Sequence, residues 1–141
     1  MIVDLDNTIA RWNTSIIKDD ARKWIADALS MGFKICILSN NMKKGRIKDI
    51  AQELHVSCCG GKGFRKPSKK AYMHALEVLN APAEETVMIG DQIYTDINGA
   101  QKMGIQGILV VPIYHREALG TKLWRVRERV SGRHIVWQDS D

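Results

Sequence analysis

Short apolar runs alternate along this chain with segments whose apolar residues recur at helical spacing, and this alternation constrains the fold most. The apolar runs are residues 1–5, 33–38, 86–89 and 108–111, and a Gly-rich stretch at 58–64 is expected to contain a further short strand. Helical spacing is found at 19–31, around 47–54, after Pro67 and at 96–103. Strands that alternate with helices form a parallel sheet covered on both faces. The chain is therefore predicted to be α/β, a three-layer sandwich around a central parallel sheet.

The chain has 141 residues, which suits one compact domain, and we expect residues 1–141 to form it. After Pro112 a basic helix is expected around 121–130, followed by a tail. Only Met1, Ile2 and Val3 precede the first acidic residue, whereas strands are usually 5–6 residues long. This leaves open that the chain is truncated or begins at an internal methionine.

Composition restricts the class of protein. With 45% apolar and 26% charged residues the chain reads as globular, and no apolar run approaches the roughly 20 residues that span a bilayer. There is no signal-peptide pattern, so we expect a cytoplasmic protein with free thiols at its three cysteines. The net charge of +5 favours anionic partners, but the chain has no nucleic-acid motif. Peripheral contact with a membrane stays open.

Polar residues stand where the predicted strands end. Asp4 and Asp6 follow the first apolar run, Ser39 and Asn40 follow the second, and Asp91 follows the strand at 86–89. Lys66 stands just before the third helix. Because parallel strands end at the same edge of a sheet, ligands bind there, near the point where the strand order reverses. We therefore expect these side chains to line one crevice.

These residue types suit a metal–phosphate site. Clustered carboxylates usually need a cation, and oxygen ligands favour a hard one such as Mg²⁺. One carboxylate could attack a phosphorus atom while a second protonates the departing alcohol. Lys66 and the Ser39 hydroxyl would hold phosphate oxygens. Taken singly each feature is more often a turn, a cap or a surface lysine, so the prediction depends on their occurrence together and in order.

The set resembles the four motifs of the haloacid dehalogenase (HAD) superfamily. Asp4-Leu5-Asp6-Asn7-Thr8 is similar to the first motif, Asp-x-Asp-x-Thr, and Ser39 after an apolar strand is similar to the second. Lys66 in Arg-Lys-Pro-Ser resembles the third, and the segment 90–96, Gly-Asp-Gln-Ile-Tyr-Thr-Asp, resembles the fourth. The closest resemblance is to the YqeG-like family of subclass IIIA phosphatases.

The resemblance implies a magnesium-dependent hydrolase of phosphate monoesters that works through an aspartyl-phosphate. Asp4 would be the nucleophile, and Asp6 would be the general acid/base. Phosphate would be bound by Ser39, Lys66 and a backbone N–H of Asn40, although a helix-cap role for Asn40 is equally open. The metal ligands would be Asp4, Asp91 and the backbone carbonyl of Asp6, and the supporting residues would be Thr8 and Asp96.

The intervals between the motifs leave no room for a large cap domain. About a dozen residues connect Asp6 to the next helix, and a helix and a turn occupy the interval from Ser39 to Lys66. Similar capless proteins often act on large substrates or use a neighbouring subunit to cover the site. We therefore expect a phosphorylated small molecule or a larger phosphorylated substrate, and a homo-oligomer is left open.

The sequence leaves other functions open. The chain could be a binding or assembly factor, for example one associated with the ribosome, that keeps the fold with weak catalysis. It could also hydrolyse phosphatidylglycerophosphate, an activity suggested only by analogy and by the basic C-terminal residues. A phosphotransferase is disfavoured because excluding water usually requires a closing lid. A receiver domain is disfavoured because its phosphate-accepting Asp normally follows a later strand.

Overall fold

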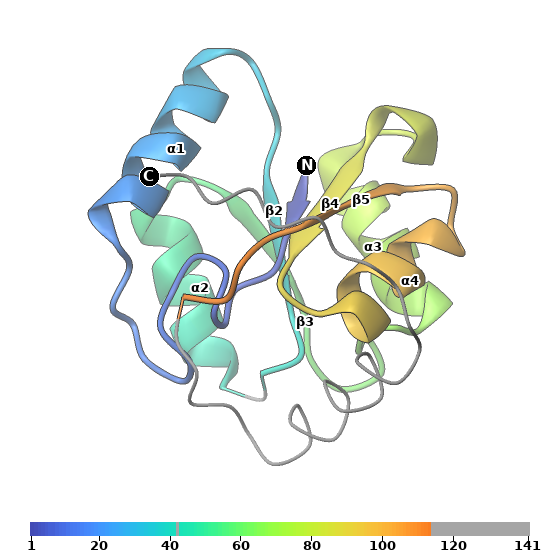
Figure 1. Ribbon diagram of the computed structural model, residues 1–141, viewed down its shortest axis with the longest axis horizontal. Helices are drawn as coiled ribbons and strands as arrows, with labels where there is room; N and C mark the ends of the chain where they lie inside the picture. Colours follow the sequence, from blue (N-terminus) through green and yellow to red (C-terminus); the bar gives the residue numbers. More distant parts are fainter. Residues whose placement is uncertain (42, 114–141) are drawn as a thin grey trace.

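A parallel five-stranded sheet forms the centre of the protein (Figure 1). The computed structural model describes residues 1–41 and 43–113, so the helix expected around 121–130 lies outside the described residues. The strand order is β3-β2-β1-β4-β5. The strands are β1 (Ile2–Val3), β2 (Cys36–Ser39), β3 (Ser57–Gly60), β4 (Val87–Gly90) and β5 (Gln106–Leu109). The predicted α/β class with a parallel sheet is confirmed.

Helices cover both faces of this sheet, which gives the three predicted layers (Figure 1). On one face lie α1 (Asp19–Ser30) and α2 (Lys44–Glu53), and on the other lie α3 (Lys69–Leu79) and α4 (Asn98–Gln101). A short 3₁₀ helix, η1 (Ala83–Glu85), precedes β4, and a π-helical turn, η2 (Ile93–Ile97), follows it. The helix predicted at 96–103 is therefore two elements, of which the first begins three residues earlier.

The core has two parts because successive strand residues point to opposite faces. Ile37 of β2 packs with Ile25 of α1 and Ile50 of α2 on one face. Its neighbours Cys36 and Leu38 pack with α3 on the other face. Several apolar residues lie outside this core, and Trp24 and Phe33 are two of them. Trp24 is 41% exposed on α1 and Phe33, in the predicted second strand, is 48% exposed because that strand begins only at Cys36.

The shortest strand occupies the centre of the sheet. β1 has two residues, as its short sequence led us to expect, yet Ile2 pairs with Cys36 of β2 and with Met88 of β4. Both residues of β1 are buried. Backbone pairing on both sides therefore holds the start of the first motif, and the amide of Asp4 continues it by donating to the carbonyl of Ile89 at 2.8 Å.

The connections near the carboxyl ends of the strands are compact. Residues 4–18 form a tight loop in which Ala10 bridges both Asp6 and Ile17. Within the described ranges, 1–41 and 43–113, no additional domain is inserted. The predicted absence of a large cap is confirmed for this part of the chain. None of the described helices is both long enough and apolar enough to span a membrane.

Candidate active site

The expected site residues gather where the strand order reverses. From β1 the chain proceeds to β2 and β3 on one side, and β4 and β5 lie on the other. Asp4 follows β1, Ser39 ends β2 and Asp91 follows β4, so all three are at the carboxyl ends of neighbouring strands. This is the position at which open parallel sheets bind ligands.

Asp4 and Lys66 form the centre of the site. The Lys66 ammonium donates to Asp4 Oδ1 and lies 2.7 Å from Asp96 Oδ1. Each of the three residues is at most 5% exposed. The other oxygen of Asp4, Oδ2, accepts a hydrogen bond from the Thr8 hydroxyl at 3.2 Å. Asn7 adopts a φ of +66°, a left-handed conformation that Asn tolerates, and this turn brings Thr8 back toward Asp4.

Burial and charge act against each other at this pair. Burial raises the pKa of Asp4 from 3.8 to about 7, although Lys66 works to lower it. For Lys66, burial disfavours the charged form, but Asp4 and Asp96 outweigh it and the pKa lies above its usual range. We therefore regard Lys66 as a permanent cation between two carboxyl groups. A further cation at Asp4 would favour its ionised form.

Three buried carboxyl groups lie close enough to hold one metal ion. One oxygen each from Asp4, Asp91 and Asp96 lies within 4.8 Å of the others. Asp96 is fully buried in η2, where its Oδ2 accepts from the Gln92 amide at 3.0 Å. Oxygen-only ligands suit a hard divalent cation such as Mg²⁺. This donor set thus fits the predicted metal.

Tyr72 holds η2, the element that contains Asp96, in place. Its hydroxyl donates to the carbonyl of Thr95 and lies 3.1 Å from the carbonyl of Asp96. The side chain is fully buried, and burial raises the pKa of its hydroxyl above the usual range. A Cβ on Gly99 would lie 2.6 Å from the Tyr72 oxygen, so the glycine makes room for it. The Tyr72 hydroxyl therefore fixes η2 by binding the backbone of η2.

Asp6 lies in a different environment from Asp4. Its carboxylate pairs with Arg46 of α2 at 2.8 Å and accepts the backbone N–H of Asn13 at 2.7 Å. A third donor is the Asn41 side chain, at 3.2 Å. Asp6 is outside the three-carboxylate group. Two carboxylates two residues apart therefore have separate partners, lysine for one and arginine for the other.

The second motif reaches the site through β2 and the residues after it. Ser39 is 1% exposed, and its hydroxyl accepts the Asn41 amide at 3.1 Å. The Asn40 side chain donates to the carbonyl of Lys66 at 2.9 Å and accepts its amide at 2.7 Å, which ties the second motif to the third. The helix-cap role considered for Asn40 is wrong, because the N-cap of α2 is Lys43. A phosphate contact through its backbone N–H stays a prediction.

Three residues of the site were not predicted from the sequence. Arg46 and Asn41 contact Asp6, and Tyr72 holds η2. Arg46 is one of 21 Lys and Arg residues, and nothing in its local sequence distinguishes it from a solvated side chain. Tyr72 follows the expected inward position Ala71, but its hydroxyl partner lies 23 residues away. A pattern of single residues does not reveal contacts of this range.

Comparison with known proteins identifies the chain. A family model described as HAD-hydrolase-like matches residues 63–121. The Bacillus subtilis protein named Probable phosphatase YqeG is 31% identical over 145 residues, which cover 99% of this chain and 83% of that protein. The chain belongs to the YqeG-like HAD hydrolases. It is therefore a phosphohydrolase, and its substrates are phosphorylated compounds.

Solved structures share the HAD fold. An uncharacterized protein from Listeria monocytogenes serotype 4b superposes with a TM-score of 0.69 at 20% identity, over 83% of each chain. The Bacillus subtilis protein YfnB, solved bound to magnesium, superposes with a TM-score of 0.58 at 21% identity. The match covers 79% of this chain and 56% of YfnB. At these identities the likeness establishes the fold alone.

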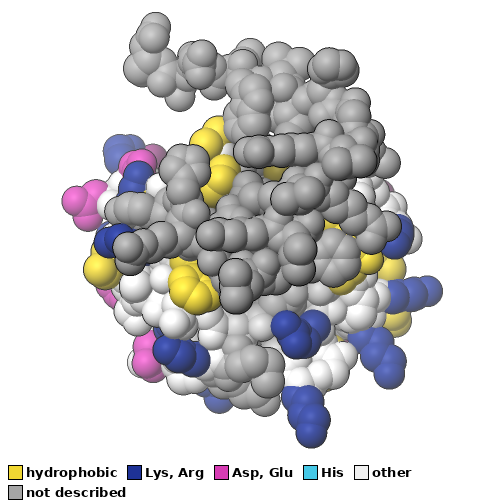
Figure 2. All heavy atoms as spheres, turned by 60° about the horizontal axis from the view of Figure 1, so that its bottom comes forward, with side chains coloured by type: hydrophobic (Ala, Val, Ile, Leu, Met, Phe, Trp, Pro, Cys, Tyr) yellow, Lys and Arg dark blue, Asp and Glu magenta, His cyan; other side chains and the backbone are white. Residues whose placement is uncertain are grey.

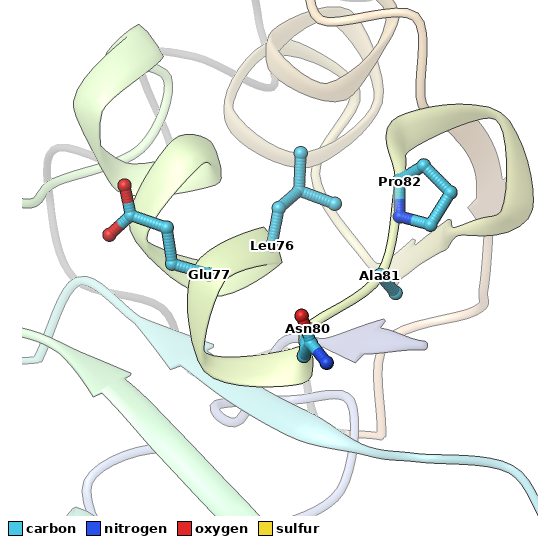
Figure 3. Close-up of a pocket in the computed structure, with 5 residues that line it drawn as sticks. All are labelled: Leu76, Glu77, Asn80, Ala81 and Pro82. Atoms are coloured by element: carbon cyan, nitrogen blue, oxygen red, sulfur yellow. The ribbon is translucent and has the colours of Figure 1, made fainter.

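One pocket lies apart from the HAD motifs. This pocket lies at the C-terminal end of α3, and Figure 3 shows its lining residues: Leu76, Glu77, Asn80, Ala81 and Pro82. None of the expected site residues lines it, and none of its lining residues is a buried acid or base.

Figure 2 views the end of the molecule that lies at the bottom of Figure 1, and Lys and Arg side chains gather along the lower right of this face. Their charge would attract phosphorylated substrates.

Proposed function

We propose that this chain hydrolyses phosphate monoesters with Mg²⁺ and an aspartyl-phosphate intermediate on Asp4. The observation that carries the proposal is the buried Asp4 carboxylate, paired with Lys66 and grouped with Asp91 and Asp96. Three clustered carboxyl groups exceed the single Lys66 cation, so the site favours a divalent cation. YfnB, which shares the fold, was solved with magnesium bound.

The metal would be held by Asp4 and Asp91, with the carbonyl of Asp6, and Asp96 would support it. When bound, Mg²⁺ would neutralise the phosphate charge and let a carboxylate approach phosphorus. Lys66 would hold a phosphate oxygen together with the Ser39 hydroxyl. Thr8 and Lys66 fix the two oxygens of Asp4, so its carboxylate is oriented before the substrate arrives.

The reaction would proceed in two steps. First, a carboxylate oxygen of Asp4 bonds to phosphorus and the bond from phosphorus to the ester oxygen breaks, while Asp6 gives its proton to the leaving oxygen. Then water attacks the phosphorus of the aspartyl-phosphate and passes a proton to Asp6. Inorganic phosphate leaves, and both carboxyl groups return to their starting states.

The decisive experiment is phosphate release from 4-nitrophenyl phosphate and a panel of phosphorylated metabolites, with Mg²⁺ and with EDTA. Wild type should release phosphate only with the metal, and Asp4→Asn should lose at least about 10³-fold in kcat because a carboxamide is a poor nucleophile. Asp20→Asn, an exposed acid in the first turn of α1, is the control and should keep full activity. Activity that survived in Asp4→Asn would refute the nucleophile assignment.

A further inference from the structure

The Asp6 carboxylate is held on both of its oxygens. Oδ1 accepts the Asn13 amide at 2.7 Å and Arg46 Nη2 at 2.8 Å. Oδ2 accepts Asn41 Nδ2 at 3.2 Å and Arg46 Nη1 at 3.3 Å. A carboxylate offers about four acceptor sites, so four donors fill it. Any proton that moves between Asp6 and a substrate must therefore replace one of these donors.

The two oxygens differ in how firmly they are held. The contacts of Oδ1 are short, and one comes from the backbone, whereas both contacts of Oδ2 are 3.2 Å or longer. Longer hydrogen bonds are weaker and are lost more easily. Asn41 also accepts the Lys43 amide at 2.9 Å through its own oxygen, so its side chain has a second partner when it releases Asp6. Oδ2 is thus the oxygen that can become free.

Arg46 is itself fixed in place. It lies in the first turn of α2, and its side chain is 7% exposed. Besides its two bonds to Asp6, its Nε donates to the carbonyl of Thr14 at 2.5 Å and its Nη2 lies 3.4 Å from the carbonyl of Arg11. The guanidinium group therefore joins α2 to the loop after the first motif. A planar fork bonded at this many points orients a carboxylate more strictly than a lysine could.

We propose that Arg46 is a positioning residue for proton transfer by Asp6. Arg46 and the Asn13 amide anchor Oδ1 and so direct Oδ2 toward the ester oxygen of the substrate. There the proton takes the place of the Asn41 donor on Oδ2 and passes from Oδ2 to the leaving oxygen. This inference rests on the proposed role of Asp6 as general acid/base. It predicts that Arg46 matters most when the leaving group needs a proton.

The test compares two substrates in wild type and in variants of Asp6 and Arg46. Nitrophenolate leaves without a proton, whereas an alkoxide such as that of glycerol phosphate needs one. The quantity compared is kcat/KM, which reports the steps up to departure of the leaving group and not the later hydrolysis of the aspartyl-phosphate, in which Asp6 also takes part. Because proton transfer contributes about 10²–10⁴-fold, we expect Arg46→Gln to lower kcat/KM for glycerol phosphate by about 10–100-fold. Its kcat/KM for 4-nitrophenyl phosphate should change by less than about threefold, since departure of nitrophenolate needs no proton from Asp6. Asp6→Asn should show the same selectivity in kcat/KM, and the double variant Asp6→Asn/Arg46→Gln should have no lower kcat/KM for glycerol phosphate than Asp6→Asn.

Controls separate positioning from folding. Arg46→Lys keeps the charge without the planar fork, so its kcat/KM for glycerol phosphate should lie between those of Arg46→Gln and wild type. If Arg46→Gln does not fold, Arg46→Lys is compared with wild type on both substrates instead. Equal losses of kcat/KM on both substrates would overturn the proposal, because a merely structural role affects both alike. If Asp6→Asn is selective for alkyl phosphates and the Arg46 variants are not, only the Arg46 inference fails. If Asp6→Asn itself shows no selectivity, the acid/base role of Asp6 fails and this inference fails with it.

Discussion

Gly90 and Asp96 lie so close together that position 90 has no room for a side chain. A Cβ on Gly90 would lie 2.7 Å from the Cβ of Asp96 and closer still to its carboxylate. Asp96 is fully buried and pairs with Lys66, so it has nowhere to move. The glycine of the Gly-Asp segment is therefore a requirement of the carboxyl group six residues later.

We expect Gly90→Ala to be destabilising and inactive. Overpacking a close contact typically costs about 1–3 kcal/mol, and the displaced carboxylate would also disturb Lys66. Denaturant unfolding and phosphatase assays measure the two effects. Gly45→Ala is the matched control, since a Cβ there meets nothing within 4 Å and the position is helical. It should be neutral or stabilising by up to about 1 kcal/mol. A Gly90→Ala variant with normal stability and activity would show that position 90 can accept a side chain beside Asp96.

How much of the site the sequence predicts depends on how far apart in the chain the contacting residues lie. The acids and Lys66 stand at element boundaries, so their meeting followed from the parallel topology alone. The start of β2 was misplaced because an apolar residue such as Phe33 fits either a strand or a loop. The start of η2 was misplaced by three residues. Arg46 and Tyr72 were missed because their contacts depend on how α2 and α3 pack against loops, and local periodicity contains no such information.

Removal of Lys66 should destabilise the metal-free protein more than the metal-bound one. Lys66→Gln leaves Asp4 and Asp96 buried without their shared cation. Removing one partner of a buried ion pair costs about 3–5 kcal/mol. Because Mg²⁺ would supply positive charge to the same carboxylates, added metal should recover part of the loss in Tm. Lys23→Gln, whose partner Asp27 is also exposed, should leave the Tm nearly unchanged because water screens such a pair. Equal small losses for both variants would contradict the buried cation.

Tyr72→Phe should weaken metal binding without removing any ligand. The hydroxyl donates to the carbonyl of Thr95 in η2, and its loss leaves this buried acceptor without its donor, at a cost of about 1–3 kcal/mol. Asp96 would then be held less firmly. We expect a lower Tm and a Mg²⁺ affinity reduced by a few-fold, measured by calorimetry. Met73→Ala, a neighbour on α3 that is 43% exposed, is the control and should leave the affinity unchanged. Unchanged affinity in Tyr72→Phe would mean that other contacts suffice to hold η2.

The contribution of Asp4 to the stability of the metal-free protein should fall as pH rises between about 4 and 7. Burial, partly offset by Lys66, raises the pKa of Asp4 from 3.8 to about 7, so the folded state binds a proton that the unfolded state has already lost in this range. A carboxyl group with a raised pKa stabilises the fold below its unfolded pKa, and that contribution is lost as pH rises through the folded pKa.

Thermal melts with EDTA at several pH values, compared between wild type and Asp4→Asn, isolate this contribution because the variant lacks the titrating group. The difference in Tm between the two proteins should shift in favour of Asp4→Asn as pH increases from 4 to 7. Mg²⁺ requires the ionised carboxylate, so the rise in Tm that it produces in wild type should be larger at pH 8 than at pH 5. A Tm difference that is flat across this range would mean that Asp4 is already ionised at pH 4 in the folded protein, with Lys66 outweighing burial.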